Sequence, residues 1–166
     1  DAAPIDAEID APSMSNVISL DFESTLPPSV DVGNAQLTPS QGFAPLGPTG
    51  GTFGPTFLRS ETGNTITVTL ASLPPHSTLT IGLLFAAIDS LDGTGTFPAG
   101  DFMRITLDGT VLMRESFANA LDTQIQSYEG PPEGVLARKV DLGFSGPGGN
   151  YRDSAYDLAV DPRFRD

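Results

Sequence analysis

The chain has 166 residues, no cysteine, and 21 acidic against 8 basic residues, which gives a formal net charge of −13. This charge repels nucleic-acid phosphates and anionic membrane surfaces, and without cysteine the chain forms neither a disulfide framework nor a thiolate metal site. The 18 Gly and 15 Pro residues favour short strands and turns, and no run reaches the roughly 20 apolar residues of a membrane span. We therefore expect one all-β domain with no nucleic-acid partner and no membrane span.

The N-terminal stretch "APIDAEIDAP" has the period of a strand. Its apolar residues are Ala3, Ile5, Ala7, Ile9 and Ala11, and they alternate with Pro4, Asp6, Glu8, Asp10 and Pro12. A half-buried strand needs this period of two, because successive side chains point to opposite sides. Two interpretations stay open: a stiff, charged spacer, or a donor strand that inserts Ile5 and Ile9 along an open sheet edge of a neighbouring copy. We divide the chain into this acidic extension, residues 1–16, and a β-sandwich domain, residues 17–166.

The first half of the domain contains three predicted strands. They are "VISLDF" at Val17–Phe22, "VDVGNAQL" at Val30–Leu37, and "NTITVTLA" at 64–71. In the third, Ile66, Val68 and Leu70 alternate with threonines, so we expect them on a core face. Between residues 38 and 55, the density of glycine and proline predicts a long irregular loop.

The second half contains the remaining strands. "STLTIGLLFAAI" at 77–88 is apolar on both faces over its second half, which predicts a central strand, and "FMRITLDGTVLMRESF" at 102–117 predicts a hairpin with a primed turn at Asp108-Gly109. "GVLARKVDLGF" and "SAYDLAV" are further strands. The core residues expected here are Leu79, Ile81, Leu83, Phe85, Met103, Ile105 and Leu107. Roughly eight strands at this spacing predict an antiparallel β-sandwich, jelly-roll-like, with an extended N-terminal strand-forming segment.

Three segments carry a family resemblance by their order and spacing: "VTLASLPPHSTLTIGLLFAAIDSLDG", "GDFMRITLDGTVLMRESFAN" and "YRDSAYDLAV". With them, residues 57–160 resemble a bacterial extracellular β-sandwich module of surface and secreted proteins, as in many PEP-CTERM-type anchored proteins. The resemblance implies the fold and an extracellular setting, and it implies no catalytic activity. The chain departs from the pattern at Leu91, where relatives commonly have Trp, and at "VDPRFRD", beyond which relatives continue. This second departure predicts a sandwich that lacks an edge strand.

The loop "DSLDGTGTFPAGD" is the best candidate for a cation site. Asp89, Asp92 and Asp101 would supply, with backbone carbonyls, the oxygen ligands that calcium prefers. The alternative is that these aspartates make Asx turns and accept backbone N–H bonds without an ion. Resemblance to β-sandwich modules whose first strand supplies a calcium ligand adds Glu23 of "DFES". Calcium is therefore the cofactor that the sequence predicts, with the Asx-turn interpretation left open.

Few residues point to catalysis. His76 is the only histidine and lies in the turn "LPPHS", and no nucleophile elbow, phosphate loop or histidine metal cluster occurs. We predict no enzymatic activity, and a hydrolytic carboxylate pair is the remaining alternative. A carbohydrate site needs exposed aromatic rings, and the chain has no tryptophan and three tyrosines, Tyr128, Tyr151 and Tyr156.

These observations favour a non-enzymatic extracellular structural protein. It would be the subunit of a cell-surface filament or layer, a homo-polymer assembled by donation of the N-terminal strand to a neighbouring subunit. The alternative is a surface-tethered, calcium-dependent carbohydrate-binding or adhesion module with a glycan partner. The start at Asp1 without an initiator Met is what we expect of an exported protein whose leader has been removed.

Overall fold

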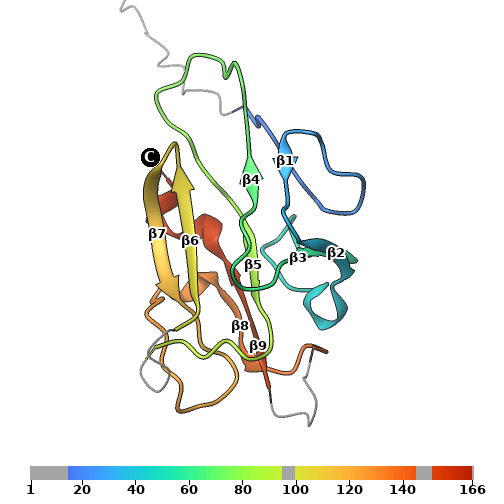
Figure 1. Ribbon diagram of the computed structural model, residues 1–166, viewed down its shortest axis with the longest axis vertical. Helices are drawn as coiled ribbons and strands as arrows, with labels where there is room; N and C mark the ends of the chain where they lie inside the picture. Colours follow the sequence, from blue (N-terminus) through green and yellow to red (C-terminus); the bar gives the residue numbers. More distant parts are fainter. Residues whose placement is uncertain (1–14, 95–99, 145–150, 166) are drawn as a thin grey trace, which may run out of the picture.

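Short strands and turns make up the part of the chain that the computed structural model describes, residues 15–94, 100–144 and 151–165 (Figure 1). The strands are β1 (Val30–Asp31), β2 (Gln36–Pro39), β3 (Thr56–Arg59), β4 (Thr67–Val68), β5 (Leu84–Ala87), β6 (Phe102–Leu107), β7 (Thr110–Ser116), β8 (Val135–Val140) and β9 (Asp153–Asp157). The helical segments of these residues are the 3-10 turns η1 (Gln41–Phe43), η2 (Pro132–Gly134), η3 (Leu158–Val160) and η4 (Pro162–Phe164). The predicted all-β class is therefore confirmed.

A three-stranded antiparallel sheet in the order β5-β9-β8 organises the fold. All five residues of β9 are buried, so β9 is the covered central strand. The prediction of a central strand over residues 77–88 is wrong, since within the described chain only Leu84–Ala87 pair, at the sheet edge. The residues before β5 bond to turns instead: Ile81 N–H donates to the Phe164 carbonyl, and Leu158 N–H donates to the Leu83 carbonyl.

The hairpin predicted around Asp108-Gly109 is confirmed as β6 and β7. Asp108 and Gly109 have φ angles of 47° and 81°, the positive values that a two-residue primed turn requires. The register of the pairing shifts between Ile105 and Thr106, which leaves Leu112 of β7 without an opposite residue. This β-bulge bends the hairpin and increases its twist.

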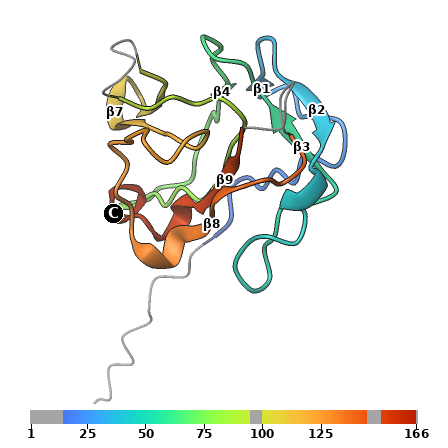
Figure 2. The ribbon, with the colours of Figure 1, turned by 90° about the horizontal axis from the view of Figure 1, so that it is seen from below.

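The central sheet has a hydrophobic cluster on each face. In Figure 1 and Figure 2 the β6–β7 hairpin lies on one side of β9 and the β2–β3 pair on the other. The buried residues of the first cluster are Ala87, Met113, Phe117, Tyr128, Tyr156, Leu158 and Phe164, and those of the second are Phe43, Phe53, Phe57, Phe144 and Ala155. Tyr156 and Ala155 are neighbours in β9, so its alternating side chains join both clusters. The described sheets hold two or three strands each, and a two-sheet jelly roll is not confirmed.

The predicted core is correct on the hairpin side and wrong at β4. The predicted core residues that lie partly buried against the first cluster are Ile81, Leu83, Phe85, Met103 and Ile105; Leu79 and Leu107 are half-buried as well. Ile66, Val68 and Leu70 are instead 43%, 44% and 36% exposed. Only Thr67–Val68 form a ladder, with β1, and an open groove separates Leu70 from the described segment that faces it.

Two predictions near the N-terminus also need correction. Val17–Phe22 forms no ladder with any described strand, and the run ends in a turn where Phe22 has a φ of 58° and the Glu23 N–H donates to Asp21 Oδ1 (3.0 Å). The predicted strand over 30–37 is divided into β1 and the start of β2 by a turn at Gly33, whose φ is 58°.

The predicted loop over residues 38–55 is largely irregular and forms part of the core. Phe43, in η1, is fully buried, and Phe53 is 7% exposed. Their rings meet edge to face with centroids 5.6 Å apart. The loop is therefore fixed by aromatic packing in the second cluster.

Candidate functional site

The outer face of the β6–β7 hairpin carries two arginines side by side. Arg104 of β6 lies directly opposite Arg114 of β7, and both are exposed. The guanidinium carbon of Arg114 lies 3.9 Å from the ring centroid of Phe102, which is 39% exposed. Among the described residues, neither guanidinium has a carboxylate oxygen within 4.0 Å. Like charges directly opposite each other destabilise a strand pair, so the hairpin carries a local electrostatic cost on this face.

The inner face of the same hairpin is apolar except for Glu115, which lies opposite Met103 and pairs with Arg163. Along β6 the residues alternate between exposed and half-buried, beginning with exposed Phe102. Met103 and Ile105, on the half-buried side, pack against the first cluster. A strand added beside β6 or β7 would therefore have a basic surface on one side and an apolar surface on the other.

The edges of this hairpin are free over most of their length. In the described chain, β6 and β7 pair only with each other. At the end away from the turn, residues 127 and 128 cover the edge of β7: Ser116 N–H donates to Ser127 Oγ (2.8 Å), and Tyr128 N–H donates to the Ser116 carbonyl (3.3 Å). Nearer the turn, the described residues offer neither strand a further backbone partner. Such an edge is a template for another strand.

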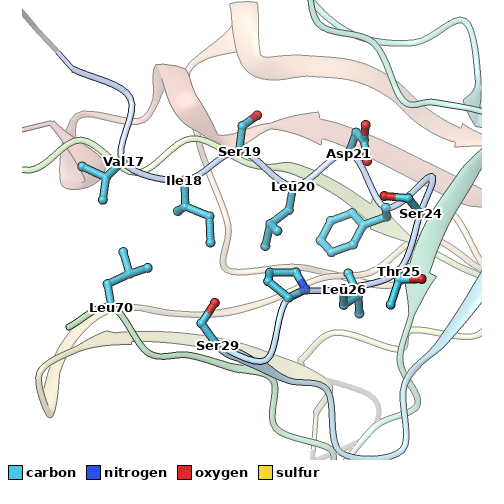
Figure 3. Close-up of a pocket in the computed structure, with 12 residues that line it drawn as sticks. Val17, Ile18, Ser19, Leu20, Asp21, Ser24, Thr25, Leu26, Ser29 and Leu70 are labelled. Carbon is cyan, nitrogen blue, oxygen red and sulfur yellow. The ribbon is translucent and has the colours of Figure 1, made fainter.

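A second apolar surface lies beside β4. It combines Ile66, Val68 and Leu70 with a groove of about 370 Å³ formed mainly by residues 17–29. Figure 3 shows Ile18 and Leu20 on one side of this groove, facing Leu70 and the segment around Leu26 on the other.

Carboxylates lie near this second surface. Asp21 lines the groove, and Asp31 of β1 lies opposite Thr67, on the other face of the β1–β4 pair. The two surfaces thus share apolar character and differ in charge.

The predicted donor residues Ala3, Ile5, Ala7, Ile9 and Ala11 lie outside the described residues. The described chain begins at residue 15, and Val17 already lines the groove of Figure 3. The donor-strand prediction therefore concerns a segment that leads directly into the described fold.

Two of the predicted calcium ligands lie together. The Asp92 N–H donates to Asp101 Oδ2 (2.7 Å), and Gln124 Nε2 donates to Asp92 Oδ1. Within the described residues, no three His, Asp or Glu side chains are placed to hold a metal ion; positions 95–99 of the loop lie outside them. The contacts of Asp92 and Asp101 match the alternative of N–H-accepting aspartates, and calcium stays a prediction.

Glu23 serves the start of β3. Its Oε1 accepts the Thr56 N–H (3.0 Å), and its Oε2 accepts the Thr56 hydroxyl (3.1 Å). A Cβ added to Gly54 would lie 1.8 Å from Glu23 Oε1, so this close approach requires glycine. No described hydrogen bond joins Glu23 to the three loop aspartates.

Asp89 belongs to a buried polar network that the sequence analysis missed. Its N–H donates to Asp153 Oδ1 (2.9 Å), and Asn119 Nδ2 donates to its carbonyl (2.5 Å). Burial raises the pKa of Asp153 above its ordinary value, against the effect of N–H bonds from Asp89 and Leu142. Asp89 Oδ1 and Asn119 Oδ1 are buried without a described partner. Asp89 and Asn119 are 30 residues apart, and no sequence motif predicts their contact.

Arg163 joins the C-terminal turn η4 to β7. Its guanidinium contacts Asp161 Oδ2 (2.6 Å) and Glu115 Oε1 (2.8 Å), and the hydrogen bond from Arg163 lowers the pKa of Asp161. Burial raises the pKa of nearby Tyr128 to about 12. The Arg163 guanidinium is already paired with both carboxylates, so this cluster stabilises the fold and has no unpaired charge for a ligand.

The described residues assemble no catalytic group around His76. Its side chain is exposed, and Nδ1 lies 2.8 Å from the carbonyl of Pro74 in the same turn. Tyr128 and Tyr156 are buried, and Tyr151 is 37% exposed. A stacking platform for a sugar would therefore depend on Tyr151 or on Phe102.

Comparisons with protein-family models, curated proteins and solved structures gave no match for this chain. In the described part of the chain, no helix is long and apolar enough to cross a bilayer. The functional argument therefore rests on the surfaces above.

Proposed function

We propose that this chain is a non-enzymatic structural protein of the cell surface, the subunit of a filament or layer that donates residues 3–11 to a neighbouring copy. One observation carries the proposal: the amphipathic β6–β7 hairpin has edges that no described strand occupies. The N-terminal segment has the same period of two and its own apolar side. Main-chain hydrogen bonds would supply affinity, and alternate side chains would supply specificity.

Strand donation accounts for the distribution of side chains in the tail. Burying Ile5 and Ile9 against an apolar surface contributes about 1.5–3 kcal/mol per side chain, while Asp6 and Glu8 stay on the polar side. A donor strand makes a heterologous, head-to-tail contact, which need not close into a ring. Filaments or layers are the expected products.

The test is a full-length variant with Ile5→Asp and Ile9→Asp, compared with a control carrying Asp6→Ser and Glu8→Ser. Sedimentation velocity and electron microscopy should show assemblies for wild type and control, and monomers for the isoleucine variant. Carboxylates against apolar walls add a burial penalty to the lost contacts. If the isoleucine variant still forms wild-type assemblies, the tail is a spacer and the proposal is wrong.

One observation favours the alternative, a calcium-dependent carbohydrate-binding or adhesion module. The oxygens Asp89 Oδ1 and Asn119 Oδ1 are buried without a described partner, and hard cations prefer such oxygens. Calorimetric titration of the full chain with calcium would show binding that Asp92→Ala removes. An isotherm that is the same in this variant would remove the loop as the site.

A further inference from the structure

We propose that the β6–β7 hairpin is the acceptor of the neighbouring copy's N-terminal strand, and that Arg104 and Arg114 bind its acidic side chains Asp6, Glu8 and Asp10. This inference rests on the proposed function and names the surface that it uses. The occupant is residues 3–11 of a second copy of this chain.

The first argument is the placement of positive charge in a protein with a net charge of −13 and only 8 basic residues. Five of these basic residues donate hydrogen bonds to described acceptors: Arg138, Lys139, Arg152, Arg163 and Arg165. The other three are Arg59, Arg104 and Arg114, and only the last two lie opposite each other on paired strands. The hairpin is therefore the place where free positive charge is concentrated.

The second argument is the match of the two faces. A strand beside β6 or β7 directs alternate side chains to opposite faces of the sheet. With Asp6, Glu8 and Asp10 on the side of Arg104, the isoleucines of the tail lie on the side of Met103 and Ile105. Carboxylates two residues apart are about 6.6 Å apart along a strand, a spacing that long arginine side chains span. The alternation of the tail and the charge of the hairpin thus agree when the added strand turns its acidic side chains to the outer face.

The third argument separates this acceptor from the surface beside β4. That surface is apolar, but Asp21 lines its groove and Asp31 lies on the other face of the β1–β4 pair, where the acidic side chains of an added strand would point. A strand with acidic residues at every second position would bring like charges together there, which destabilises strand pairing. At the hairpin, the same acidic residues relieve the repulsion between Arg104 and Arg114.

The experiment uses full-length protein and charge reversal. At low salt, Arg104→Glu with Arg114→Glu should weaken assembly by roughly tenfold or more, because at least two ion pairs become repulsive. The matched control is Arg59→Glu, since the Arg59 guanidinium also lies over an aromatic ring, 5.0 Å from the centroid of Phe144. Sedimentation velocity measures the association constants.

Compensating reversal keeps this test specific. Mixing the reversed-hairpin variant with a variant carrying Asp6→Lys, Glu8→Lys and Asp10→Lys should restore association to within a few-fold of wild type. A hairpin variant that simply failed to fold would not be rescued in this way.

A disulfide trap provides an independent measurement, because the chain has no cysteine of its own. Full-length variants with a single Cys at position 6, 8 or 10 are mixed with Thr106→Cys on the outer face of β6, or with Thr69→Cys beside β4 as control. Cross-linked dimers through position 106 in at least one register support the hairpin. Cross-links through position 69 alone overturn it.

The outcomes separate this inference from the proposed function. If Ile5→Asp with Ile9→Asp abolishes assembly while the reversed hairpin assembles like wild type, strand donation stands and the hairpin is the wrong acceptor. If neither change affects assembly, both the proposed function and this inference are wrong.

Discussion

Replacing Arg163 by Met should destabilise the fold by removing the tie between η4 and β7. Arg163 Nε and Nη2 donate to Asp161 (2.9 and 2.6 Å), and Nη1 donates to Glu115 (2.8 Å). The Asp161 side chain is only 2% exposed, whereas that of Arg163 is 34% exposed. Methionine keeps the apolar stem and leaves a buried carboxylate whose remaining described partners are the backbone N–H of residue 163 (3.0 Å) and the Tyr128 hydroxyl.

The size of the effect follows from burial and screening. Breaking a buried ion pair by removing one partner costs about 3–5 kcal/mol. Because a third of the Arg163 side chain is in water, solvent replaces part of the lost interaction. We expect a loss of about 2 kcal/mol in the free energy of unfolding at pH 7, after this discount.

Urea unfolding of the full chain measures this loss, with Arg165→Met as the matched control. Arg165 Nε donates only to the Ala159 carbonyl (2.7 Å) among the described acceptors, so its replacement should cost less than about 0.5 kcal/mol.

The hydrogen bond from Arg163 lowers the folded-state pKa of Asp161 below 3.8. The stabilisation is therefore complete above pH 3.8 and is lost as the pH falls through the folded-state pKa. A difference between wild type and Arg163→Met that is below about 0.5 kcal/mol at pH 7, or that stays constant well below this window, would refute the reasoning.

Two further predictions concern local structure. Gly109→Ala should cost about 1 kcal/mol, because φ is 81° there and the added Cβ meets open space, so the cost is backbone strain alone. Gly51→Ala is the control, because the added Cβ also meets open space but the backbone of Gly51 has no positive φ. Equal losses of stability for both variants in thermal unfolding would contradict the role of backbone strain. Asp153→Ala should cost roughly 2–3 kcal/mol, because the Asp89 and Leu142 N–H groups lose their buried acceptor. Asp141→Ala, which removes an acceptor in an exposed turn, should cost much less in urea unfolding.

The sequence predicted those parts of the fold that depend on local chemistry. The hairpin followed from one Asp-Gly turn between two runs of strand formers, and β8 lies within its predicted segment. β9 overlaps the predicted "SAYDLAV" but begins one residue earlier and ends at Asp157, after which η3 begins. The order of strands in the sheet is not local. β9 occupies the centre of the sheet because its side chains alternate between two clusters, with Tyr156 in the first and Ala155 in the second, an arrangement that the pattern of "SAYDLAV" alone does not reveal.

The β4 region shows the limit of periodicity. Ile66, Val68 and Leu70 have the alternation of a half-buried strand, yet all three are exposed. Alternation reports which side chains share a face, and burial also requires a second layer on that face. Local sequence also limits what can be predicted of the candidate sites. Asp92 and Asp101 belong to one loop, so their contact could be predicted. Asn119 and Asp89 come together only through tertiary packing, so their contact could not.

The arginine pair depends on a detail that a turn rule alone misses. In a regular two-residue hairpin centred on Asp108-Gly109, Arg104 would lie opposite residue 113. The bulge adds Leu112 to β7, so Met113 moves opposite Ile105 on the apolar side and Arg114 moves opposite Arg104. One inserted residue thus keeps the apolar side chains on the core face and places two like charges together on the outer face. The chain has 21 acidic residues, yet no described carboxylate pairs with Arg104 or Arg114. We therefore interpret the arginine pair as a surface for an acidic strand from another subunit.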